Sequence, residues 1–149
     1  GKAAKIVAIN EAYYNYYQRS GSIQNNTFSE SRFALLRTAK ICIDKAEKLG
    51  IEKQQIIKNS LYAHQILALA LYPIREQSFL KRRRLLMSYI KQINDIFPDF
   101  WGNQAIRAYG MQDNVKEKTF KQFSVKLLQH KYYFIVCCFW SVVNAILKN

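Results

Sequence analysis

Acidic side chains are scarce in this sequence. Only ten Asp and Glu residues stand against 23 Lys and Arg residues in 149, which gives a net charge of +13. No two acids form an Asp-x-Asp pair, and the five glycines make no phosphate-binding loop. A nucleophile motif is also missing, so the sequence shows no self-contained active site. Its charge either serves solubility alone or favours an anionic partner, such as nucleic acid, acidic lipid or a phosphorylated substrate.

Cysteine and histidine are also few, and none has the spacing of a metal site. The three cysteines, Cys42, Cys137 and Cys138, fall in apolar helical surroundings. We interpret them as small core residues of a protein in a reducing compartment. His64 has no Cys or carboxylate at ligand spacing, so we interpret it as a hydrogen-bonded core residue. The sequence itself predicts no metal and no cofactor.

Long hydrophobic runs are absent as well. The most hydrophobic segment extends from Tyr132 to Leu147, and its sixteen residues fall short of the roughly 20 that span a bilayer. Cys137, Ser141 and Asn144 form a less apolar stripe, which predicts an amphipathic helix with a wide apolar face. Three roles stay open for this face: packing inside the domain, contact with a second copy or another domain, or a position in a membrane interface.

Helical periodicity is what the sequence does contain. Half of the residues are hydrophobic, which is enough for a core. Apolar residues recur at helical spacing, and Gly50, Pro73 and Pro98 mark expected helix ends. We predict helices over residues 29–49, 52–72, 76–97, 113–129 and 132–147, with a short helical piece at 103–109. The predicted fold is a mainly α-helical bundle of about five helices, with a short extended segment at the N-terminus.

Two of these helices carry predictions about packing. Residues 61–71 are apolar nearly all round, so the second helix should be the central buried one. The first helix has a seam of residues at helical spacing that we expect to face the core, namely Leu35, Ala39, Cys42, Ala46 and Leu49. Three further residues widen this seam into one core-facing stripe: Phe33, Leu36 and Ile43.

The densest basic run lies in the third predicted helix and consists of Lys81, Arg82, Arg83 and Arg84. Consecutive helical side chains point about 100° apart, so these four cannot all bind one ligand. They form a solvated helix face, or they contact anionic lipid head groups or a nucleic-acid backbone. Nucleic acid is the least favoured partner, because most aromatic residues fall on internal stripes and no zinc knuckle or RRM signature is present.

Residues 13–23 differ in character from the rest of the chain. Four tyrosines within five positions favour extended backbone, and Ser20-Gly21-Ser22 then indicates a turn. Arg19 lies at this junction, where a cation beside a donor-rich loop makes a candidate anion site. Residues 4–9 favour a second short extended segment, and two isolated strands need a sheet to join. We therefore expect a further domain on the N-terminal side of Gly1.

Residues 4–23 resemble the end of the catalytic domain in bacterial family 2 glycosyltransferases, which often carry a tyrosine-rich strand followed by an Arg-x-Gly-Ser-Ile loop. The segment Arg19-Ser20-Gly21-Ser22-Ile23 matches that loop. Residues 29–39 look like the helix that follows the loop in this family. The sequence departs from the family at Tyr17, where an arginine is common. That difference makes the loop a poorer clamp for a diphosphate than the family pattern implies.

The resemblance implies a parent enzyme that transfers a sugar from a nucleotide-sugar donor during cell-surface polysaccharide synthesis. Residues 1–28 would be the tail of its catalytic domain and residues 29–149 a helical C-terminal domain. The Asp-x-Asp motif, its Mg or Mn ion and a carboxylate base would precede Gly1, so this chain alone would not be catalytic. The site residues that the resemblance implies for the donor or acceptor pocket are Arg19, Gly21 and Ser22.

The resemblance also implies a place in the cell. Such a protein would be cytoplasmic or peripheral on the inner face of the cytoplasmic membrane. The apolar face of the segment from Tyr132 to Leu147, and not the resemblance, makes a homo-oligomer a further candidate. The alternative function is a non-enzymatic basic helical module that docks on an anionic membrane or a protein partner.

Overall fold

The computed structural model describes residues 30–147, and all regular structure in this range is helical. The range contains no strand, which confirms the predicted mainly α-helical bundle. Its elements are η1 (Glu30–Phe33), α1 (Ala34–Lys48), α2 (Gln54–Ser60), η2 (Leu61–Leu67), η3 (Ala70–Ile74), α3 (Phe79–Ile96), η4 (Phe100–Gly102), α4 (Gln104–Arg107), α5 (Val115–Gln129) and α6 (Tyr133–Leu147). The predicted extended segment, with Arg19, Gly21 and Ser22, lies outside the described residues.

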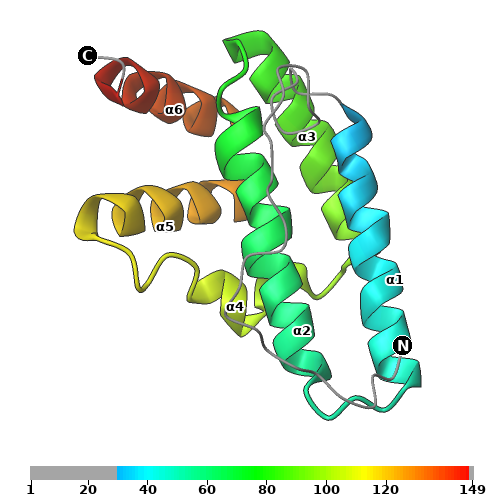
Figure 1. Ribbon diagram of the computed structural model, residues 1–149. Coiled ribbons are helices and arrows are strands. Elements are labelled where there is room, and N and C mark those ends of the chain that lie inside the picture. The colour runs from blue at the N-terminus through cyan, green and yellow to red at the C-terminus, as the bar shows by residue number, and fades with distance from the viewer. Residues whose placement is uncertain (1–29, 148–149) are drawn as a thin grey trace, which may run out of the picture.

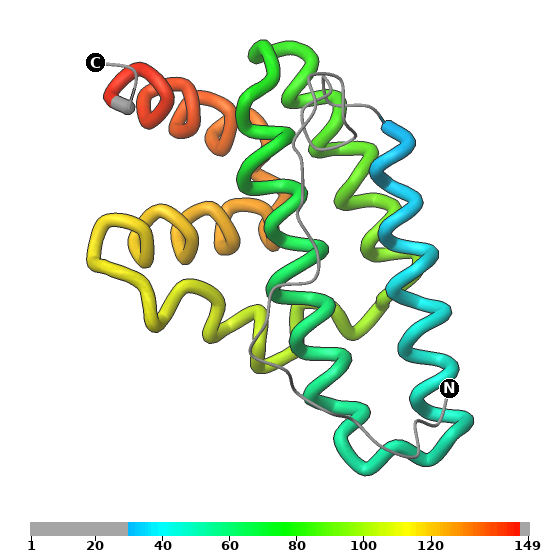
Figure 2. The backbone as a smooth tube through the Cα atoms, viewed as in Figure 1, coloured from blue at the N-terminus to red at the C-terminus, as the bar shows by residue number. Residues whose placement is uncertain are grey.

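Two groups of helices make up the bundle. Helix α1, the long helix that begins with α2, and α3 lie side by side (Figure 1). Helices α5 and α6 pack against each other and extend away from those three, toward the left in Figure 2. Helix α6 also packs against α3, so it joins the two groups. None of the described helices has the length and apolar character that a membrane crossing requires.

Helix α1 ends where the sequence predicts. Gly50 has a φ of 58°, the left-handed conformation that glycine adopts without steric cost. Its N–H donates to Glu47 O at 3.0 Å, and the N–H of Ile51 donates to Ala46 O at 3.1 Å. These two bonds form a Schellman motif, which satisfies carbonyls at the helix end.

The buried face of α1 is narrower than the predicted stripe. The buried residues of α1 are Leu36, Ala39, Ile43 and Ala46, and Phe33 of η1 is buried just before them. Cys42 and Leu49 are exposed, so their predicted place in the core is wrong. Cys138 is exposed as well, and only Cys137 of the three cysteines is a core residue. The predicted stripe contains the buried face, and apolar spacing alone does not show where that face ends.

The central helix is buried as predicted, but it does not stop at Pro73. Helix α2 continues through the π-helical turns of η2 and η3, and Pro73 lies inside the last of these. A π turn is wider than an α turn, which gives the proline ring room against the preceding turn. Ile74 is fully buried just after it. His64 is exposed on this helix, so its interpretation as a core histidine is wrong.

Helix α3 and the later helices follow the predicted pattern. Leu86, Ile90 and Ile93 of α3 are fully buried, and the helix ends just before Pro98. Helix α5 begins within the range predicted for it, 113–129, where Asn114 Oδ1 caps the helix by accepting the N–H of Glu117 at 3.0 Å. The core therefore runs between all the long helices and leaves their outer faces to define any functional surface.

Candidate functional site

The basic run of α3 divides between the interior and the surface. Arg83 and Arg84 are exposed, and Lys81 is half-buried. Arg82 is only 4% exposed, so the structure removes it from the predicted membrane or anion contact. The division follows from the 100° step between consecutive helical residues, which turns one of four inward whenever the helix packs on a neighbour.

Arg82 joins α3 to α6. Its Nη1 donates to Cys137 O and to Ser141 Oγ, both at 2.9 Å, and its Nη2 donates to Gln77 O at 2.9 Å. No carboxylate pairs with it among the described residues. Burial lowers the pKa of the guanidinium, and the positive charge of Arg75 acts in the same direction. Arg82 is thus a buried cation held by neutral oxygens.

The less apolar stripe of α6 faces the protein. Ser141 Oγ donates to Cys137 O at 2.9 Å in addition to accepting from Arg82. Asn144 Nδ2 donates to Arg75 O at 3.1 Å. The polar groups of this helix are therefore used in contacts with η3, α3 and the turn between them. A polar stripe turned inward leaves part of the apolar surface of α6 turned outward.

The outward face of α6 is mostly apolar, with Ser141 exposed at its edge. Helix α6 contains no charged residue, and its large exposed side chains are Phe134 (60% exposed), Ile135 (49%), Val142 (59%) and Ile146 (68%). Cys138 is exposed between them, and residues four apart lie on one face of a helix. Contiguous apolar surface of this kind marks contact with a membrane or another protein more often than isolated exposed residues do.

Cations border this outward face. Arg83 is exposed on α3 one turn after Phe79, whose ring contacts Phe134 of this face with 5.7 Å between the ring centres. Lys131 is exposed in the turn that leads into α6, with a positive φ of 60°. An uncharged apolar helix face beside exposed cations is the combination that binds anionic membrane surfaces.

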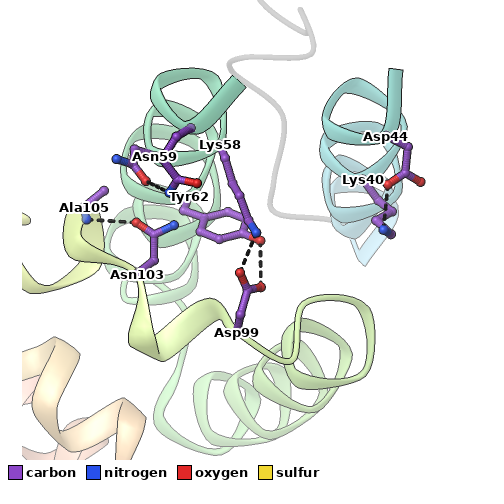
Figure 3. Close-up of polar contacts among 9 residues, drawn as sticks. Lys40, Asp44, Lys58, Asn59, Tyr62, Asp99, Asn103 and Ala105 are labelled. Carbon is purple, nitrogen blue, oxygen red and sulfur yellow. Dashed lines mark hydrogen bonds and ion pairs between the residues drawn. The ribbon is translucent and has the colours of Figure 1, made fainter. Parts of the chain in front are cut away.

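A second polar cluster lies at the other end of the bundle. Lys58 and Tyr62 of the central helix meet Asp99, which follows α3 (Figure 3). Lys58 forms an ion pair with Asp99 at 2.5 Å, and the Tyr62 hydroxyl donates to it at 3.2 Å. Burial alone would raise the pKa of Asp99, but the hydrogen bond and charge of Lys58 and the Tyr62 hydrogen bond together outweigh it, so the pKa is lowered. No second carboxylate of the described residues forms an ion pair in this cluster, so the cluster ties the central helix to the loop after α3.

The part of the chain that the structure describes contains no metal-binding cluster. No three His, Cys, Asp or Glu side chains within residues 30–147 come together as a metal ion would require. Comparison with known proteins adds no relative, because no family model, curated protein or solved structure matches the chain.

Sequence reasoning missed two features of these sites. It placed the polar stripe of α6 correctly, but periodicity does not reveal which stripe faces the neighbouring helices. It also gave no signal for the contact of Lys58 with Asp99, because the two are 41 residues apart and meet only in the tertiary fold.

Proposed function

We propose that residues 30–147 form a non-catalytic docking domain that attaches a larger protein to an anionic membrane surface. The observation that carries the proposal is the outward face of α6, which presents Phe134, Ile135, Val142 and Ile146 with no charge among them. The helix lies in the membrane interface with this face toward the acyl chains. Arg83 and Lys131 lie at the level of the head groups.

The energies suit reversible attachment. Each of the four side chains is roughly half exposed, and transferring that exposed part from water contributes about 1 kcal/mol. Each cation near an anionic surface adds about 1 kcal/mol. The sum, about 6 kcal/mol, is close to the binding of a single myristoyl chain, which leaves and rebinds membranes.

We propose further that the larger protein is a family 2 glycosyltransferase. Support comes from Arg19-Ser20-Gly21-Ser22-Ile23 and the residues around it, which resemble the end of that catalytic domain. Its Asp-x-Asp motif and divalent metal belong to a domain on the N-terminal side of Gly1. Arg19, Gly21 and Ser22 contribute to the donor or acceptor pocket, and the membrane-facing helix keeps the enzyme at the inner face of the cytoplasmic membrane.

Vesicle co-sedimentation tests the docking proposal. The chain should bind vesicles that contain phosphatidylglycerol, and bind vesicles of pure phosphatidylcholine much more weakly. Ile135→Ser with Val142→Ser removes about 2 kcal/mol of apolar contact, which lowers the partition coefficient about thirtyfold. The matched control, Ile41→Ser with Ile56→Ser, changes two equally exposed residues on α1 and α2 and should have little effect.

Two results would count against docking. One is equal loss of binding in both double variants, which would mean that any exposed apolar residue suffices. The other is a stable dimer in the absence of vesicles that the Ile135 and Val142 changes convert to a monomer, because the face would then belong to a second copy.

The parent enzyme is tested separately. The reading frame upstream of Gly1 should encode alternating strands and helices with an Asp-x-Asp motif. In that full-length enzyme, Arg19→Ala should lower sugar transfer while leaving the fold intact. A frame without such a domain refutes the glycosyltransferase proposal and leaves membrane docking to stand on its own evidence.

A further inference from the structure

A groove between α5 and α6 shares only Ile146 with the docking face, and neither proposal uses the rest of its lining. It opens beside the end of η3 and has a volume of about 560 Å³, within the range of small-molecule sites. Most of its lining is apolar, and the residues that matter for its chemistry are Tyr72, Arg75, Phe120, Phe139, Val143 and Ile146.

Arg75 is the unusual member of this lining. Its guanidinium lies 5.1 Å from the ring centre of Phe120 and 5.6 Å from that of Tyr72. Its Nε is buried and has no hydrogen-bond partner, and its side chain forms no ion pair with any described residue. Buried polar donors are almost always partnered, so an unpartnered one marks a place where an acceptor is bound favourably.

The charge around Arg75 favours an anion as that acceptor. The positive charge of Arg75 contributes to the lowered pKa of Arg82, so the two guanidinium groups lie near each other. The Nε of Arg82 is also buried without a hydrogen-bond partner. The other charged residues of the groove are Lys116 and Glu117, which offset each other. Glu117 is already near Lys121, with 3.7 Å between Oε2 and Nζ. The inner part of the groove is thus positively charged, while its walls are apolar.

We propose that this groove binds one molecule of a single-chain amphiphile with an anionic head group. The carboxylate of a fatty acid represents this chemistry. The head group accepts hydrogen bonds from Arg75, and the alkyl chain lies along Phe120, Phe139 and Val143. Half-buried aromatic and aliphatic walls suit a saturated chain, and the guanidinium of Arg75 fixes its direction.

This binding differs from membrane docking. Docking uses the outward face of α6 and a lipid surface, whereas the groove takes up a single amphiphile from solution. Ile135 and Val142 line only the outward face, so the Ile135→Ser, Val142→Ser variant separates the two proposals.

Isothermal titration with the full chain and three ligands of equal chain length provides the test. Dodecanoate, below its critical micelle concentration, should bind with one-to-one stoichiometry. Dodecan-1-ol should bind at least about tenfold more weakly, because a neutral acceptor forms a weaker bond with a guanidinium. Dodecyltrimethylammonium should show no saturable binding. Equal affinity for dodecanoate and dodecan-1-ol would overturn the proposal without any variant.

Variants then locate the site. Arg75→Leu should weaken dodecanoate binding about tenfold or more, and Val143→Trp should weaken it by filling the groove while keeping Arg75. Arg84→Leu removes an equal charge from the exposed face of α3 and should leave the affinity unchanged, as should the Ile135, Val142 variant. Binding that survives Val143→Trp, or that Arg84→Leu weakens as much as Arg75→Leu, would place the amphiphile elsewhere and refute the inference.

Discussion

Replacing Arg82 with methionine tests how α6 is held to the bundle. The guanidinium donates three hydrogen bonds, to Cys137 O, Ser141 Oγ and Gln77 O, and each is 2.9 Å long. Methionine fills a similar volume but donates none of them. The question is whether the lost bonds outweigh the relief of removing a buried charge that has no carboxylate partner.

The contacts around Arg82 decide whether Arg82→Met lowers or raises the free energy of unfolding. Each lost bond is worth about 1 kcal/mol net, so the three together contribute about 3 kcal/mol. Cys137 O keeps a second partner in the Ser141 hydroxyl, which limits the loss. Removing the buried charge returns part of its desolvation cost, about 1 kcal/mol after the neutral oxygens that solvate it are counted. We therefore expect Arg82→Met to lower the free energy of unfolding by about 2 kcal/mol.

Urea unfolding followed by circular dichroism measures this change. With an m-value of about 2 kcal/mol/M, the midpoint should fall by about 1 M. Arg83→Met is the matched control, because Arg83 is the exposed neighbour, and its midpoint should shift by no more than about 0.25 M. An Arg82→Met protein as stable as the wild type, or more stable, would mean that burying the charge costs more than its hydrogen bonds return.

The remaining predictions concern two glycines and one acid. Gly110→Ala should lower the free energy of unfolding by about 1 kcal/mol more than Gly50→Ala does, as measured by urea unfolding. Both glycines have positive φ, but of these two only Gly110 would place a new Cβ against a side chain, that of Lys121 at 3.0 Å. Equal costs for the two substitutions would contradict this reasoning. The lowered pKa of Asp99 means that its ion pair stabilises the fold above the unfolded-state pKa and stops doing so as the pH falls through the folded-state value. At pH values below about 4, the wild-type protein should therefore lose more free energy of unfolding than the Asp99→Asn variant. The difference between the two should be less than about 1 kcal/mol, because the Asp99 side chain is 56% exposed. Parallel pH profiles would refute the pairing with Lys58.

The helices of this protein could be predicted because their signals are local. Gly50, Pro98 and Asn114 act on the backbone within one turn, and each ends or begins a helix where the sequence indicates. The prediction that the central helix ends at Pro73 was wrong. This helix widens into π turns that accommodate the proline, and no local sequence signal indicates this widening.

The surface could be predicted only in part. The stripe predicted on the first helix contained its buried residues but also Cys42 and Leu49, which are exposed, because apolar spacing does not show where the buried face ends. The basic run at Lys81–Arg84 indicated a cationic surface, but it did not indicate that the side chain of Arg82 is buried. Both outcomes depend on which helix packs against which face, and that information is spread over residues far apart in the chain.

The cysteines of the protein allow the central claim, that the outward face of α6 enters an anionic membrane, to be measured directly. Cys138 lies on that face, Cys42 is exposed on α1, and Cys137 is buried and protected from labelling. An environment-sensitive fluorophore can therefore be attached at Cys138 in a Cys42→Ser protein, or at Cys42 in a Cys138→Ser protein. On addition of phosphatidylglycerol vesicles, the account predicts a blue shift for the Cys138 label and none for the Cys42 label. No shift at Cys138, or equal shifts at both positions, would contradict it.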